Sequence, residues 1–147
     1  MPATTVEIGR APEQVFAYVT DPGRFTEWQH GVVSGHLDDD LPPGPGTRCV
    51  TVRKVGFAQR PVTSEITHVD PPRTWGVRGI DGPIRATVNV TVEPVDGGRG
   101  AKVSVDVDFT GHGIGKLLVP LVVRPQARRE MPENLQRLKD RLQQSPT

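Results

Sequence analysis

Hydrophobic and polar residues alternate along the middle of the chain with a period of two. Turn residues interrupt this alternation about every ten positions between residues 31 and 110, which is typical of antiparallel strands. The alternation is strictest at residues 86–92 and 103–109, where one face is apolar and the other is polar. A β-branched segment near the N-terminus adds one more strand. The seven predicted strands are Thr4–Ile8, Gly31–Asp38, Thr47–Val55, Gln59–Val69, Thr74–Ile80, Ile84–Glu93 and Ala101–Thr110.

Two short helices are predicted between the first and second strands. Residues 12–19 place three apolar side chains on one helical face, and a proline opens this segment where its missing N–H is tolerated. Asp21 can cap a second helix over residues 22–28. In that helix Phe25 and Trp28 are three positions apart, so both can point into the core.

The C-terminal third of the chain, residues 113–143, returns to helical spacing, with apolar residues at intervals of three and four. A proline inside a helix removes a backbone donor and clashes with the preceding turn. We therefore expect a bent helix of two or three pieces rather than one straight rod. The interrupting prolines are Pro120, Pro125 and Pro132.

The order of these elements, one strand, two helices, six strands and one long helix, predicts an α+β fold. A helix of about 30 residues is roughly 45 Å long, more than one face of a flat sheet can cover. We therefore expect a strongly curved antiparallel sheet of about seven strands around a long, kinked C-terminal helix. Sheet and helix would part in the middle and leave an apolar cavity. A solid core, in which the aliphatic side chains simply meet, is the alternative.

Several short motifs carry a family resemblance over nearly the whole chain. They are residues 6–8 (VEI), 11–16 (APEQVF), 21–22 (DP) with Trp28 behind them, 63–67 (TSEIT), 70–73 (DPPR), 93–98 (EPVDGG) and 135–139 (LQRLK). In these motifs and in its element order the chain resembles the START-like helix-grip superfamily, specifically its polyketide cyclase/dehydrase (SRPBCC) branch. The resemblance implies a hydrophobic ligand. It leaves open whether that ligand is transformed, because the superfamily contains both carriers and ring-closing enzymes.

The aromatase/cyclases that the chain resembles carry a serine and an arginine two residues apart on one strand. The serine position matches Ser64, but the arginine position holds Ile66. An arginine would hold carbonyl oxygens and stabilise the enolate that forms on ring closure, and isoleucine offers no donor. Cyclase chemistry by that arrangement is therefore not expected. A strand serine without a neighbouring base is otherwise a satisfied hydroxyl.

The candidate ligand pocket consists of large side chains expected to face the helix. Trp28 and Trp75 would provide rigid walls for a flat apolar ligand, with core packing as the alternative. The complete set is Trp28, Val50, Val52, Ser64, Ile66, Trp75, Val77, Val88, Val90, Val105, Val107, Phe109, Leu117 and Leu121.

Polar residues near this predicted pocket offer only weak catalytic candidates, namely Ser64, His68 and Arg78. Glu65 and His68 are three apart on a strand, so we expect them on opposite faces and not as an acid/base pair. Arg78 and Arg85 lie near the turn between the fifth and sixth strands, where family members often keep a basic residue. Solvent exposure is the ordinary alternative for both arginines.

Arg53 and Lys54 are consecutive residues at the end of the third strand, so at most one of them can face inward. The default expectation for both is a solvated face. The histidines support no metal site, because no His-x-x-x-His or Cys-x-x-Cys spacing occurs. His112 could lie at the mouth of a pocket or belong to a turn. We expect no metal and no cofactor.

Composition narrows the class of protein. The chain has 147 residues, one cysteine (Cys49) and a formal net charge of +1, and it is expected to form a single domain over residues 1–147. Near-neutral charge disfavours nucleic-acid binding, and a lone cysteine excludes an intrachain disulfide. The longest apolar run is too short to insert into a membrane, and the N-terminus lacks an apolar leader. A cytoplasmic protein is expected.

Three functional hypotheses remain open from the sequence. The first is a carrier or sensor that binds a small hydrophobic, lipid-like or polyketide-like molecule between sheet and helix. The second is a polyketide cyclase or dehydratase acting in the same cavity. The third is a homodimeric interaction module without a ligand. Neither ligand identity nor the choice between monomer and homodimer follows from the sequence.

Overall fold

The protein is built on one seven-stranded antiparallel sheet. In the computed structural model, which describes residues 3–37, 44–55, 58–82 and 84–144, the strands lie in the order β1-β7-β6-β5-β4-β3-β2. All seven predicted strands are confirmed to within two residues over the described ranges, and Asp38 lies outside them. The strands are β1 (Thr4–Ile8), β2 (Val32–Leu37), β3 (Arg48–Val55), β4 (Ala58–Asp70), β5 (Thr74–Gly79), β6 (Ile84–Val95) and β7 (Gly100–Gly111).

The two predicted short helices are also present between β1 and β2. Helix α1 (Pro12–Val19) begins with its proline in the first turn. A 3₁₀ turn, η1 (Pro22–Arg24), leads directly into α2 (Phe25–Trp28). As expected, Asp21 caps this segment: its Oδ1 accepts a hydrogen bond from the Gly23 N–H at 3.0 Å.

The C-terminal helical segment consists of three pieces, in agreement with the predicted bend. They are α3 (Gly115–Leu118), a π-helical turn η3 (Val119–Val123) and the 21-residue α4 (Arg124–Gln144). Of the three prolines only Pro120 lies at the irregular turn. Pro125 falls in the first turn of α4, and Pro132 is accommodated inside this helix.

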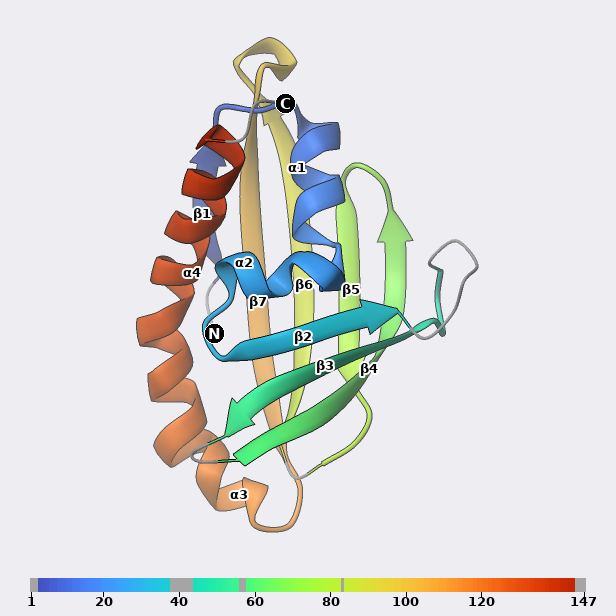
Figure 1. Cartoon of the computed structure of the whole chain (residues 1–147), viewed down its shortest axis with the longest axis vertical. Helices are drawn as coiled ribbons and strands as arrows, with labels where there is room; N and C mark the ends of the chain where they lie inside the picture. Colours follow the sequence, from blue (N-terminus) through green and yellow to red (C-terminus); the bar gives the residue numbers. More distant parts are fainter. Residues whose placement is uncertain (1–2, 38–43, 56–57, 83, 145–147) are drawn as a thin grey trace.

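The sheet curls strongly: β2, β3 and the start of β4 cross in front of β6 and β7, and β4 then turns upward to run beside β5 (Figure 1). Helix α4 follows the side of the sheet formed by β1 and β7, whereas α1 and α2 cover its upper concave face. Seven antiparallel strands wrapped around a long C-terminal helix form a helix-grip fold, and that prediction is confirmed.

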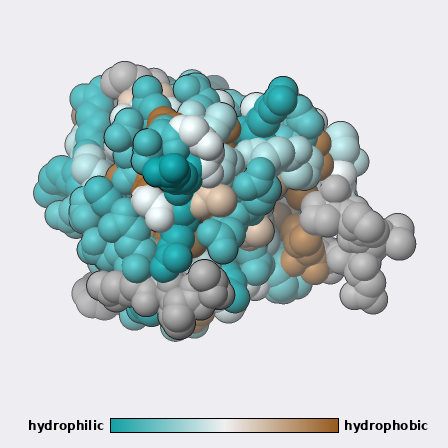
Figure 2. Space-filling view, turned by 90° about the horizontal axis from the view of Figure 1, so that it is seen from above, coloured by the Kyte–Doolittle hydropathy of each residue, from teal (hydrophilic) through white to brown (hydrophobic). Residues whose placement is uncertain are grey.

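One hydrophobic cluster fills the upper part of the concave face. Helices α1, α2 and α4 contribute Val15, Phe16, Val19, Phe25, Trp28, Leu135, Leu138 and Leu142. The strands contribute, among others, Ile66, Trp75, Val77, Val90, Val92, Val103 and Val105. Seen from above, the molecule is mainly hydrophilic, with hydrophobic residues only in small areas (Figure 2).

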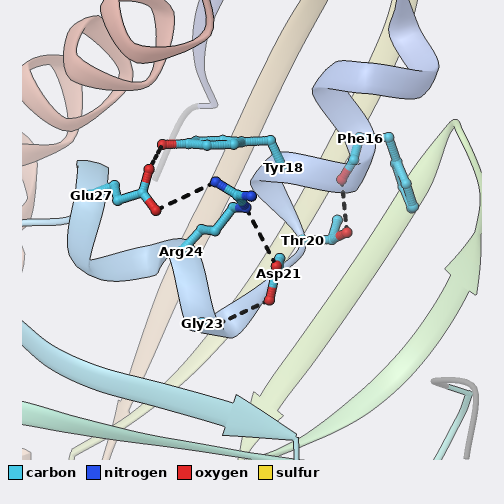
Figure 3. A network of polar contacts seen from close by, with 7 residues as sticks. All are labelled: Phe16, Tyr18, Thr20, Asp21, Gly23, Arg24 and Glu27. Carbon is cyan, nitrogen blue, oxygen red and sulfur yellow. Dashed lines mark hydrogen bonds and ion pairs between the residues drawn. The ribbon is translucent and has the colours of Figure 1, made fainter. Parts of the chain in front are cut away.

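A polar network fastens the end of α1 to α2 (Figure 3). The Tyr18 hydroxyl donates a hydrogen bond to Glu27 Oε1 at 2.7 Å. The Arg24 guanidinium lies 5.3 Å from the centre of the Tyr18 ring, and it is 3.6 Å from Glu27 and 3.7 Å from Asp21. Burial is the main cause that raises the pKa of Tyr18 above its usual value, and the hydrogen bond to Glu27 is the second cause. The phenol is therefore a fixed donor, and α2 is held in place over the sheet.

Candidate functional site

Strand register decides which side chains share the concave face of the sheet. Ile66 lies opposite Val77, which lies opposite Val88, and directly opposed residues point to the same side. Ser64 is two positions from Ile66 and opposite Cys49, so it also faces the concave side. The central concave row is therefore apolar, with one hydroxyl and one thiol at its margin.

In the upper half of the concave face, the predicted pocket residues are packed into the core. Trp28 and Trp75 are each only 4% exposed, and both rings contact Phe25 edge-to-face, with centroids 6.0 and 6.2 Å away. Val90 and Val105 lie in the same cluster. The two tryptophans are therefore core residues, which is the alternative that the sequence left open for them.

The lower half of the concave face is covered less completely. Ser64, Ala86, Val88 and Phe109 are only partly buried there. Across this region the C-terminal helical segment offers little cover, since no residue from Pro120 to Glu133 is fully buried, and all of them belong to the described part of the chain. Apolar surface of the sheet is thus accessible beneath the first half of α4.

Arg53 faces the concave side near the end of β3, next to Gln29, which directly follows α2. It continues the inward series of Cys49 and Thr51, both buried, while Lys54 is exposed. Arg53 Nε donates a hydrogen bond to Thr51 Oγ1 at 3.2 Å, and Nη2 donates one to Gln29 Oε1 at 3.2 Å. The expectation that both basic residues are solvated is therefore wrong for Arg53, and burial lowers the pKa of its guanidinium.

The weak catalytic candidates do not come together. Arg78 lies on the convex face, 3.7 Å from Glu65, and its side chain is 62% exposed. A β-bulge between Ile66 and His68 inserts Thr67 into β4, so that Thr67 and His68 both lie over Gly76 on the convex face. The expected opposition of Glu65 and His68 is therefore wrong, because the bulge shifts the alternation by one residue. Neither His68 nor Arg78 can act with Ser64.

Four other predicted pocket residues lie away from the concave face. Val50 and Val52 alternate with the inward Cys49 and Thr51, so they point to the convex side. Leu117 and Leu121 are 66% and 72% exposed, respectively, on α3 and η3. None of these four residues therefore lines the concave face.

Two hollows open at the lower end of the molecule. One, of about 330 Å³, gathers Arg78, Arg85 and His112 around Thr87 and Thr110. The other, of about 460 Å³, runs between β7 and the π-helical turn. Its lining residues include Phe109, Lys116, Val119, Pro120 and Arg124. Phe109 therefore connects the second hollow with the lower concave face.

Neither a metal site nor a membrane span is indicated by the described residues. No three His, Cys, Asp or Glu side chains in this part of the chain lie close enough together to hold a metal ion. Likewise, no described helix is both long and apolar enough to cross a bilayer. Cys49 is buried, and burial raises the pKa of its thiol from 9.0 to about 11. The thiol is therefore mostly protonated at physiological pH, and its reactive thiolate form is scarce.

The fold and this half-open concave face define a helix-grip protein with accessible apolar surface under its C-terminal helix. The chain belongs to the family described as polyketide cyclase / dehydrase and lipid transport, whose sequence profile matches residues 3–143. The predicted resemblance is thus confirmed. A search of curated proteins found no match.

Comparison with solved structures gives the same fold. The Zhui aromatase/cyclase from Streptomyces sp. R1128 is similar with a TM-score of 0.75 and 13% identity, over 95% of this chain and 90% of that one. DR_A0006 from Deinococcus radiodurans gives a TM-score of 0.70 and 19% identity, over 96% and 95% of the two chains. Ara h 8.0201 gives 0.69 and 17%, over 97% and 99%. At such identities the likeness shows a common fold and no common activity.

Proposed function

We propose that this protein binds a small hydrophobic molecule, lipid-like or polyketide-like, on the lower concave face of the sheet. The observation that carries the proposal is the partly buried apolar surface of Val88, Ala86 and Phe109 beneath a helix half that buries no residue of its own. Binding of an apolar ligand against a concave wall is favourable, because it removes the apolar surface of both from water. The family's description, which includes lipid transport, supports the same class of ligand.

The predicted pocket is redefined accordingly. Its wall consists of Ser64, Val88 and Phe109 on the sheet, and we include the partly buried Met131 of α4, which packs against the same core cluster. Trp28, Trp75, Val90 and Val105 support this wall from the core, together with the buried Ile66, Val77 and Val107. We propose that the protein binds this ligand in the cytoplasm, where a lone buried thiol such as Cys49 stays reduced.

Displacement of a neutral fluorescent dye by dodecan-1-ol tests this proposal. Both compounds are uncharged, so binding would depend on apolar surface alone. We expect saturable binding that weakens about fivefold in Val88→Thr, because one methyl group is replaced by a hydroxyl. The matched control is Val50→Thr, a partly buried valine on the convex face, which should leave the affinity unchanged.

Two outcomes would contradict the proposal. Absence of dye binding to the folded protein would leave the homodimeric module without ligand as the remaining hypothesis. Equal weakening in the Val88 and Val50 variants would mean that the dye does not bind the concave face.

A ring-closing enzyme is the second candidate function, favoured by the hydroxyl of Ser64 on the accessible part of the concave face. Ile66 is 2% exposed and offers no donor, so an enolate would depend on other groups for stabilisation. Incubation with a poly-β-ketone mimic distinguishes the two functions. Ring closure faster than in buffer, and slowed in Ser64→Ala, would establish the enzyme, whereas a rate equal to that in buffer would eliminate it.

A further inference from the structure

The guanidinium of Arg53 is held inside the fold by neutral partners only. Its two hydrogen-bond acceptors are the hydroxyl of Thr51 and the amide oxygen of Gln29. Thr51 is buried. Gln29 directly follows α2, whose last residue, Trp28, accepts a hydrogen bond at its carbonyl from Arg137 of α4 at 3.3 Å. Arg53 therefore joins β3 to the end of α2, which Arg137 in turn joins to α4.

No acidic side chain compensates this charge among the described residues. The ion pairs in this part of the chain involve Arg24, His30, Arg78 and Arg124, and none includes Arg53. A buried charge is ordinarily paired, because removal from water is costly and only an opposite charge offsets it.

The neighbouring strand increases this positive charge. Arg60 of β4 lies directly opposite Arg53 in the β3–β4 ladder, and its side chain is exposed. Directly opposed like charges are unfavourable in a sheet. The two arginines thus place two positive charges on one face without an acidic partner among the described residues.

The geometry of Arg53 suits a single carboxylate. Of the five N–H groups of its guanidinium, two are used by Thr51 and Gln29, and the remaining three can bind two carboxylate oxygens side by side. A carboxylate also carries the one negative charge that would neutralise the partly buried Arg53. Arg53 lies near the end of β3, which crosses in front of the lower part of β7 in Figure 1.

We propose that the ligand is a hydrophobic acid whose carboxylate pairs with Arg53 while its apolar body covers the lower concave face. This inference rests on the proposed function. It adds the chemical class of the head group, with Arg53 as the residue that binds it.

Comparison of dodecanoate with dodecan-1-ol tests the inference, at about pH 8 so that the acid is ionised. Both probes are used below the concentrations at which they form micelles. The wild-type protein should bind dodecanoate at least about tenfold more tightly than the alcohol, since charged hydrogen bonds are the strong ones. In Arg53→Met this preference should disappear while the affinity for the alcohol persists. Arg78→Met, a convex-face control, should keep the preference.

A second measurement avoids dependence on the folding of the Arg53 variant. In the wild-type complex, the carboxyl carbon of [1-¹³C]dodecanoate should titrate below the pKa of the free acid, because an adjacent guanidinium favours the ionised form. A carboxyl buried without a cation would titrate above it.

Equal affinities for acid and alcohol in the wild type, a preference that survives Arg53→Met, or a raised pKa of the bound acid would each overturn the inference. In each of these cases the alcohol still binds, so the proposed function stands. Failure of both probes to bind would instead reject the proposed function itself.

Discussion

Polar residues on the inward face of β3 distinguish this concave face from a purely aliphatic one. Cys49, Thr51 and Arg53 all point inward, although the alternating valines of the same strand are the more hydrophobic set. The sequence of β3 has apolar residues in both phases, so hydrophobicity alone selects the wrong face. Only the pairing of Cys49 with Ser64 and of Thr51 with Val62 determines which set is inside.

The raised pKa of Cys49 predicts a pH dependence of the unfolding free energy. Because the thiol titrates at about 11 when folded and at 9.0 in its usual state, the folded protein holds the proton more tightly. This contribution to stability is complete below pH 9 and is lost as pH rises from 9 to 11, amounting to at most about 2–3 kcal/mol. Urea unfolding at a series of pH values measures it, with Cys49→Ala as the reference.

The same thiol should resist alkylation. We expect iodoacetamide at pH 8 to modify the folded protein far more slowly than the urea-unfolded chain, because the reactive thiolate is scarce and buried in the folded state. Equal alkylation rates in the two states would contradict both the burial and the pKa of Cys49.

The hydroxyl of Tyr18 is a second residue with a measurable contribution. Tyr18→Phe removes the 2.7 Å hydrogen bond to Glu27 and leaves the ring in place, so we expect a loss of about 1 kcal/mol in unfolding free energy. Glu27→Gln keeps an acceptor and should cost less. An unchanged midpoint in Tyr18→Phe would mean that the network of Figure 3 does not fasten α1 to α2.

Among the secondary-structure elements, the C-terminal helix shows which of its prolines interrupt it and which do not. The break at Pro120 follows from its missing donor, and α4 nevertheless continues through Pro132. Beyond Pro132 the helix is anchored by the buried side chains of Leu135, Leu138 and Leu142. Tertiary packing therefore outweighs the local cost of this proline, a balance that spacing along the chain does not contain.

Leucine-to-alanine substitutions along this helical segment test that division. Leu138 is 0% exposed, so Leu138→Ala should cost about 2–5 kcal/mol through lost burial and a cavity. Leu121→Ala removes a side chain that is 72% exposed and should change the unfolding free energy by less than about 0.5 kcal/mol. Chemical denaturation of the two variants gives the comparison, and similar costs would contradict the outward turn of η3.

The backbone of β2 approaches the turn η1 closely. A Cβ atom on Gly35 would collide with the carbonyl oxygen of Pro22, so two backbones touch where only glycine fits. Gly35→Ala should therefore cost about 1–3 kcal/mol. Gly44→Ala is the control, since nothing lies within 4 Å of its added Cβ. If thermal unfolding shows equal effects, β2 and η1 are not in contact.

For the whole molecule, the order of elements and the curved sheet could be predicted because period-two alternation, turn residues and the length of the last helix leave few other arrangements. The site could be predicted only in part. The bulge at Thr67 moves His68 to the convex face, and nothing in the residues 63–69 indicates an extra residue in the ladder. How much of the concave face α4 covers depends on the bend at η3, and the sequence does not predict this extent.

NMR titration of the folded protein with dodecan-1-ol shows whether the lower concave face holds an apolar ligand. We expect saturable shift changes at Ser64, Val88, Phe109 and Met131, with little change at the convex-face Val50. Changes confined to the exposed leucines of α3 and η3, or no saturable change anywhere, would contradict it.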